Sequence, residues 1–296
     1  MMEGFTAYLQ GQGYSEKSIE HYLWRLRGYG DWCKKRRLDK EQLGYQDMLK
    51  YVKYLKSKGW QPQSINNQLR GIKYYFDHLM EDDIRLDNPA NDVKIRRQRT
   101  KVMGNLLGSD ELEDLYYSYE TEGINDFYFT ATAKRNKVIV GLIVYQALNS
   151  STLAKLRTEH LQLQRGKICV PGTKRSNGRT LELKPWQVLD MMAYLDEHRP
   201  KIQKHIELYD DMLFPLNSDQ FHIILNGIMA KLKRTNYRVR NTSQLRASVI
   251  TLWLKKHNIR ETQKMAGHVC IGSTEKYVQD NLENLQEAVK SCHPLA

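Results

Sequence analysis

A break in the helical pattern near residue 90 constrains the fold of this chain more than any other feature. Asn88-Pro89 blocks continuation of a helix, and the stretch 94–101 that follows carries five basic residues with few apolar anchors. Helical periodicity precedes the break, whereas helical and strand-like patterns alternate after it. A length of 296 residues also agrees with two domains of roughly 150 residues each. The sequence therefore predicts a helical domain over 1–93, a basic linker over 94–107 and a second domain over 108–296.

The first domain is predicted to be a bundle of about four helices. Apolar residues from Ile19 to Cys33, from Met48 to Leu55 and from Ile65 to Leu79 recur with a period near 3.6 residues. Ser15 is expected to cap the first of these helices, and Gly59 to end the second. A shorter helix is indicated before them by Phe5, Tyr8 and Leu9.

The second domain has a mixed pattern. A helix is expected over 135–156, and two strands over 167–171 and 180–183 enclose the basic turn 172–179. Ser109 is the expected cap of the domain's first helix. Further helices are expected over 186–195, 220–232, 243–256 and 260–266. The predicted fold class is mainly α with a small β-sheet (α+β).

The composition favours an anionic partner. Lys and Arg number 46 against 34 Asp and Glu, which gives a net charge of +12 and a pI of about 9.4. Nucleic acid is the commonest partner of so basic a protein, although a soluble protein with an incidental basic pI has the same net charge.

No apolar run approaches the roughly 18–20 residues that span a bilayer, and the N-terminus lacks a secretory pattern. The cysteines (Cys33, Cys169, Cys270, Cys292) have no pairing or metal-type spacing. A cytoplasmic protein without a metal site is expected.

The C-terminal third carries the residues with the most distinctive chemistry. Leu245-Arg246 is followed 21 positions later by Gly267-His268, and Tyr277 comes nine positions after the histidine. A tyrosine can break a phosphodiester while keeping the bond energy in a phosphotyrosine ester. An arginine fork suits the charged non-bridging oxygens, and a lysine such as Lys174 in the strand turn can protonate a leaving oxygen.

This order of residues resembles the tyrosine recombinase (phage integrase) family, and the resemblance extends over nearly the whole chain. The segments 5–9 and 15–22 are similar to the family's helical, SAM-like core-binding domain, and 108–115 to the start of its mixed α/β catalytic domain. The resemblance implies a C-shaped clamp of two domains around DNA. It also implies that Tyr277 attacks, that Arg246 and His268 hold the phosphate, and that Lys174 protonates the leaving 5′-oxygen, with no metal or nucleotide cofactor.

Two positions depart from the family pattern. The family has a Gly-Leu-Arg stretch followed by an acidic residue three positions later, and here Ala147-Leu148-Asn149 is followed by Thr152. The family histidine three residues before the second arginine is Ser243 here. Asn149 and Ser243 can donate hydrogen bonds but supply no positive charge. Loss of such a donor typically lowers the rate about 10²–10³-fold.

Three functions fit these departures. The first is a site-specific recombinase of a mobile element that integrates, excises or inverts DNA, with another cation in place of the missing arginine; the candidates are Arg238, Arg240, Arg175 and Arg179. The second is a catalytically weakened DNA-binding or regulatory protein on the same fold. The third is a relaxing topoisomerase. Retention of Tyr277 and Lys174 beside the two phosphate ligands favours the first.

The expected partners are a double-stranded DNA recombination site and further copies of this chain. DNA backbone contacts are expected from basic residues of both domains: Lys34, Lys35, Arg36, Arg37, Arg96, Arg97, Arg99, Arg175 and Arg179. Such contacts position the protein without reading sequence, and a solvated surface is their ordinary alternative. After Tyr277, apolar residues at helical spacing (Leu282, Leu285, Val289) resemble the family's terminal segment, which implies docking onto a neighbouring protomer in a tetramer. Packing on their own domain is the alternative.

Overall fold

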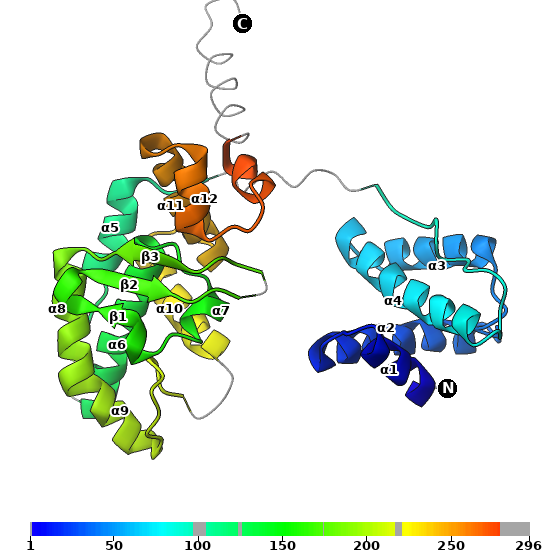
Figure 1. Ribbon diagram of the computed structural model, residues 1–296, viewed down its shortest axis with the longest axis horizontal. Coiled ribbons are helices and arrows are strands. Elements are labelled where there is room, and N and C mark those ends of the chain that lie inside the picture. Colours follow the sequence, from blue (N-terminus) through cyan, green and yellow to red (C-terminus); the bar gives the residue numbers. More distant parts are fainter. Residues whose placement is uncertain (1, 97–104, 124–125, 174, 217–220, 279–296) are drawn as a thin grey trace, which may run out of the picture. The chain divides into compact units, whose positions relative to one another are not determined.

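The chain forms two compact units, which span Met1–Thr100 and Lys101–Ala296 (Figure 1). The computed structural model describes residues 2–96, 105–123, 126–173, 175–216 and 221–278. The division between the units falls within the stretch 94–107 that the sequence predicts as a linker. Each unit has its own buried apolar cluster, so each has the core that an independent domain requires.

The first unit consists of helices packed around aromatic side chains. Tyr29 of the second helix, Tyr51 of the third and Phe76 of the fourth are almost fully buried together. Gly59 follows the third helix with a φ of 76°, the left-handed conformation that favours glycine. Ser15 occupies the cap position of the second helix, although its side chain makes no capping bond to the backbone. The helices are α1 (Met2–Gly11), α2 (Glu16–Lys35), α3 (Tyr45–Ser57) and α4 (Pro62–Glu81).

The second unit combines a small antiparallel sheet with a majority of helices, as the predicted fold class requires. The sheet has the order β1-β2-β3, and β2 pairs with β3 in a register that sets Val170 opposite Arg179. The strands are β1 (Leu161–Gln162), β2 (Lys167–Val170) and β3 (Arg179–Glu182). The helices are α5 (Ser109–Tyr117), α6 (Phe127–Val144), α7 (Ser150–Leu153), α8 (Pro185–Ala193), α9 (Arg199–Ile206), α10 (Phe221–Thr235), α11 (Thr242–Lys256) and α12 (Ile259–Ala266).

The helix predicted over 135–156 is wrong at both ends. It begins earlier because the Asp126 side chain accepts hydrogen bonds from the backbone N–H groups of Tyr128 and Phe129 and so caps α6. It ends at Val144, and the chain then passes through Ala147 with a φ of 51°, which no α-helix permits. The separate short helix α7 starts after Asn149. The break therefore places Asn149 at a helix N-terminus instead of in a helix interior.

Two smaller differences concern the start of α5 and the sheet. Gly108, not Ser109, holds the cap position of α5, and the Glu111 carboxylate accepts a hydrogen bond from the Gly108 N–H. The strand β1 is absent from the sequence-based expectation because two residues are too few to show a periodicity of two.

The buried helix α6 organises the second unit. Every residue from Val138 to Val144 is buried, so the C-terminal half of this helix is apolar on all sides and packs in the centre. Helices α5, α8, α9 and α11 all contact it, and its buried residues belong to the same apolar cluster as Ile168 and Leu181 of the sheet. The chain that leaves α6, the β2–β3 turn and the ends of α11 and α12 supply the residues described next. Among the described residues, no helix is long and apolar enough to cross a membrane.

Candidate active site

Arg246 connects three segments of the second unit. It lies on α11, which Asn241 caps at its N-terminus and which Leu245 anchors in the core. The guanidinium donates hydrogen bonds to the carbonyl oxygens of Ala147 and, at 2.8 Å, of Ala266. Its Nη2 also lies 3.4 Å from His268 Nε2. These contacts hold the guanidinium in one place between the end of α6 and the end of α12.

His268 follows α12 directly and is held at both ring nitrogens. Its Nδ1 lies 2.9 Å from the hydroxyl of the buried Thr274. Because arginine can only donate, Nε2 accepts from Arg246 and Nδ1 carries the hydrogen, which it donates to Thr274. Burial, reinforced by the charges of Arg246, Arg179 and Lys276, lowers the pKa of His268 to about 4. The imidazole is therefore neutral in the free protein.

Tyr277 stacks on His268. The two ring centroids are 6.0 Å apart and the ring planes differ by 7°. Burial raises the pKa of Tyr277, and the nearby charge of Arg246 lowers it in part. The structure thus brings together Arg246, His268 and Tyr277, three of the four residues that the sequence motif predicts as catalytic.

The fourth residue, Lys174, lies outside the described residues, but the chain on either side of it is described. Thr173 N–H donates to the Ser176 carbonyl oxygen at 2.7 Å, which closes a tight turn. Asn177 N–H then donates to the Gly267 carbonyl oxygen at 3.0 Å, and Ser176 forms a β-bridge with His268. The β2–β3 turn is therefore attached to the segment that carries the histidine.

The two substituted positions are occupied by neutral side chains. The Asn149 amide oxygen caps α7, because it accepts hydrogen bonds from Thr152 N–H at 2.9 Å and from the Ser151 hydroxyl at 2.8 Å. Ala147 adopts the left-handed conformation that glycine favours, at the position where the family has glycine. This agreement supports the alignment of Asn149 with the family arginine. Ser243 is exposed in the first turn of α11.

Of the four arginines considered as replacements, only one is buried in this site. Arg238 is engaged elsewhere, in an ion pair of 2.7 Å with Glu111 and a hydrogen bond to the Leu106 carbonyl oxygen. Arg240 and Arg175 are exposed. Arg179 is 6% exposed and lies against Gly267, so it differs from the expected surface contact to a DNA backbone. Its position follows from the strand pattern, since Arg179 and Leu181 share the buried face of β3.

Sequence reasoning also missed Thr274, which orients His268. It lies three residues before Tyr277 in a polar stretch, and nothing in the one-dimensional pattern distinguishes it from Ser273. Only the folded chain shows that its side chain is fully buried against the imidazole.

The predicted DNA-contacting clusters are mostly solvent-accessible. Lys34, Lys35, Arg36 and Arg37 are all exposed at the end of α2. The Arg36 guanidinium also lies over two aromatic rings, 4.9 Å from the Trp32 centroid and 5.1 Å from the Tyr54 centroid. Arg96 is exposed, whereas Arg97 and Arg99 lie outside the described residues.

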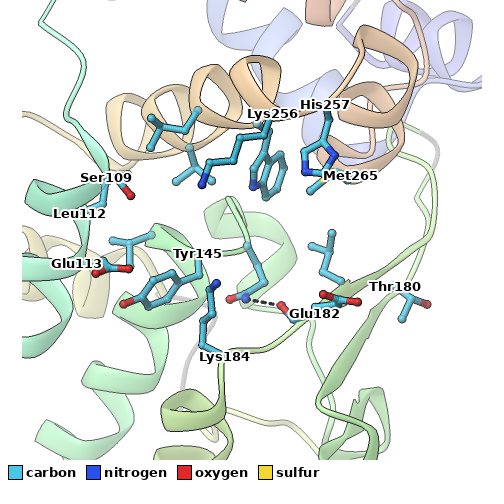
Figure 2. Close-up of a pocket in the computed structure, with 16 residues that line it drawn as sticks. Ser109, Leu112, Glu113, Tyr145, Thr180, Glu182, Lys184, Lys256, His257 and Met265 are labelled. Atoms are coloured by element: carbon cyan, nitrogen blue, oxygen red, sulfur yellow. Dashed lines mark hydrogen bonds between the residues drawn. The ribbon is translucent and has the colours of Figure 1, made fainter.

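A pocket of about 520 Å³ opens between α5, β3 and α11 (Figure 2). Its apolar wall includes Leu252, Trp253 and Met265, and charged side chains such as Glu113 and Lys256 line it as well. Figure 2 also shows the hydrogen bond of 2.8 Å from the Gln146 amide to the Glu182 carbonyl oxygen, which ties the end of α6 to β3. Of the predicted catalytic residues that the structure describes, none lines this pocket.

Both units match known families. Residues 1–86 match the N-terminal SAM-like domain of phage integrases, and residues 106–284 match the phage integrase family. The tyrosine recombinase XerD of Listeria innocua is 24% identical over 265 residues, which cover 87% of this chain and 85% of that protein. XerA of Thermococcus kodakarensis is 24% identical over 294 residues, with coverage of 97% and 93%.

Solved structures have the same fold. The XerH site-specific recombinase bound to a palindromic difH substrate superposes with a TM-score of 0.74 at 16% identity, covering 95% of this chain and 82% of that one. The Tn1549 transposon integrase in complex with transposon right end DNA gives 0.64 at 15% identity, covering 97% and 98%. The chain therefore belongs to the phage integrase family of tyrosine recombinases, enzymes that cleave and rejoin DNA.

Proposed function

We propose that this protein is a site-specific recombinase that cleaves and rejoins DNA through Tyr277 and serves a mobile element. The observation that carries the proposal is the convergence of Arg246, His268 and Tyr277 from separate segments. A protein that only bound DNA would have no use for a tyrosine packed beside two phosphate ligands.

The chemistry follows from the residue types. The Tyr277 hydroxyl oxygen attacks the phosphorus and releases its proton to water, the bond to the 5′-oxygen breaks, and the phosphate remains on the DNA 3′ end as a tyrosine ester. Lys174 gives the leaving 5′-oxygen its proton. Arg246 stabilises the charge that develops on the non-bridging oxygens. An anionic phosphate beside His268 raises the pKa of the imidazole, which allows Nε2 to donate as well. The reverse reaction rejoins the strands, without metal or nucleotide.

A nicked suicide substrate tests the cleavage step. The substrate carries the recombination site, located as short repeats that flank the gene, and the nick lets the cleaved fragment diffuse away so that the covalent complex accumulates. We expect an adduct that resists SDS, and its loss in Tyr277→Phe. The exposed Tyr237 provides the control, since Tyr237→Phe should retain the adduct.

The same assay separates the alternatives. Tight binding of the site with no adduct under any condition would support the DNA-binding or regulatory protein instead. Relaxation of supercoiled DNA without exchange between two sites would support the topoisomerase.

We further propose that four copies assemble on two DNA sites in the cytoplasm, each contributing its segment 279–296 to a neighbour. The pocket of Figure 2 is the candidate acceptor, because its wall of Leu252, Trp253 and Met265 suits the apolar residues Leu282 and Leu285. Truncation after residue 278 should leave the suicide adduct intact and abolish synapsis, measured as pairing of two labelled duplexes. Normal synapsis by the truncated chain would exclude this role.

A further inference from the structure

The side chain of Arg179 is buried without the partners that a guanidinium needs. Only 6% of the residue is exposed, and its Nε and Nη2 atoms have no hydrogen-bond partner in the described part of the chain. Its one hydrogen bond there runs from Nη1 to the Asn177 carbonyl oxygen at 3.5 Å, near the limit for such a bond. Burying an unpaired charge is strongly unfavourable. Within the described ranges this side chain is therefore left with N–H groups that a further partner can bind.

The local backbone is shaped to accommodate this guanidinium. A Cβ atom on Gly267 would collide with Arg179 Nη1 and would lie only 2.9 Å from Cζ. Gly267 is the residue between α12 and His268. The guanidinium therefore occupies space that only a glycine leaves open, directly beside the phosphate ligands.

Two positive charges meet here without a counter-charge. Arg246 is a cause of the lowered pKa of Arg179, and both arginines contribute to the lowered pKa of His268. Within the described ranges, neither arginine has a carboxylate within ion-pair distance. Burial and the charge of Arg246 lower the pKa of Arg179 to about 10, so it remains protonated at neutral pH. An anion that enters the site would neutralise this pair.

We infer that Arg179 is the cation that replaces the arginine missing at Asn149, and that its unpaired N–H groups serve the scissile phosphate beside Arg246. The inference rests on the proposed function, since it assigns a second guanidinium to the same reaction. Arg238, another of the candidates, is already paired with the Glu111 carboxylate. Asn149, which caps α7 with its amide oxygen, has no charge to contribute.

The first test compares Arg179→Gln with a matched control in the suicide-substrate assay. Arg165 is an exposed arginine of the same unit, in the short 3₁₀ turn that joins β1 to β2, so Arg165→Gln removes the same charge outside the candidate site. We expect Arg179→Gln to form the Tyr277 adduct roughly 10²–10³-fold more slowly, with DNA affinity and circular dichroism close to those of the parent, and Arg165→Gln to react normally.

The second test restores a positive charge at position 149, where the family has its arginine. Adding Asn149→Arg to Arg179→Gln returns a guanidinium to the family position, and we expect the adduct to form at least about tenfold faster than in Arg179→Gln alone. A purely structural role of Arg179 would not be repaired in this way.

The third test removes the charge from the DNA. With a methylphosphonate at the scissile position the reacting group is neutral, so the cation loses its function, and the deficit of Arg179→Gln should shrink by about tenfold or more. This substrate decides the question if the double variant fails to fold. A deficit of equal size on both substrates, or a normal rate in Arg179→Gln, would overturn the inference. Absence of a Tyr277 adduct in the parent protein would instead refute the proposed function.

Discussion

The single hydrogen bond between His268 and Thr274 fixes which imidazole nitrogen faces Arg246. Thr274→Val keeps the side-chain shape but leaves the Nδ1–H of His268 without its acceptor. An unsatisfied buried donor of this kind lowers the free energy of unfolding by about 1–3 kcal/mol. Urea unfolding of the two proteins measures the loss, and Thr274→Ser, which retains the hydroxyl, should recover most of it. Equal stability of Thr274→Val and the parent would show that the bond does not orient the ring.

His268 also makes stability depend on pH in a direction that can be calculated. Its pKa is about 4 in the folded protein and about 6.5 when unfolded. Between these values the unfolded chain binds a proton that the folded chain does not, so the free energy of unfolding falls as the pH is lowered from about 6.5 towards 4.

We expect His268→Gln to have a weaker pH dependence over this range, measured as the urea midpoint at pH 7.5 and pH 5. The pKa of the buried His198 is lowered as well, but it contributes equally to both proteins, so their difference isolates His268. Parallel curves for the two proteins would contradict the assignment.

At the scale of elements, Gly267 has two roles: it ends α12, and it leaves room for the Arg179 guanidinium. Gly267 has a φ of 71°, and Gly166 has a φ of 60° with no atom nearer than 3.9 Å to an added Cβ. Gly267→Ala and Gly166→Ala should therefore both lose about 1–2 kcal/mol of stability, because alanine is strained in the left-handed region.

Only Gly267→Ala should also lose cleavage, by roughly 10²–10³-fold, because its Cβ displaces Arg179. Thermal unfolding and the suicide substrate measure the two effects separately. Comparable cleavage by both variants would show that the guanidinium tolerates displacement.

The elements differ in how well the sequence predicts them. Helices such as α2 and α4 bury one face, so their apolar periodicity is visible in the sequence. The C-terminal half of α6 is buried on all sides and has no such periodicity to mark where the helix stops. Its termination depends on the left-handed turn at Ala147, a residue that normally favours helix. The sequence therefore predicts helix where the chain turns to form one wall of the site.

For the whole molecule, the excess of basic residues should contribute to DNA affinity mainly because each phosphate contact releases counterions from the DNA. Lys34, Lys35, Arg36 and Arg37 are all exposed, and of these four only Arg36 lies over an aromatic ring in the described part of the first unit. Replacing Lys34, Lys35 and Arg37 by glutamine should weaken DNA binding and reduce the salt slope by roughly 0.9 for each phosphate that is no longer neutralised. Filter binding over a range of salt measures this slope. Because no catalytic group changes, the rate of adduct formation at saturating protein should remain that of the parent, and an unchanged slope would remove this cluster from the DNA interface.

The sequence by itself determined the family, the helical and mixed halves of the chain, and the proposed nucleophile, because these depend on local periodicity and on a motif of fixed spacing around Arg246, His268 and Tyr277. The tertiary structure decided which further charge lies near them. Arg179 lies 67 positions before Arg246 in the chain, and its burial, its missing partners and its fit against Gly267 arise only when β3 packs against α12. A one-dimensional pattern records residue types and spacing, whereas the electrostatic environment of a side chain depends on every segment that folds around it.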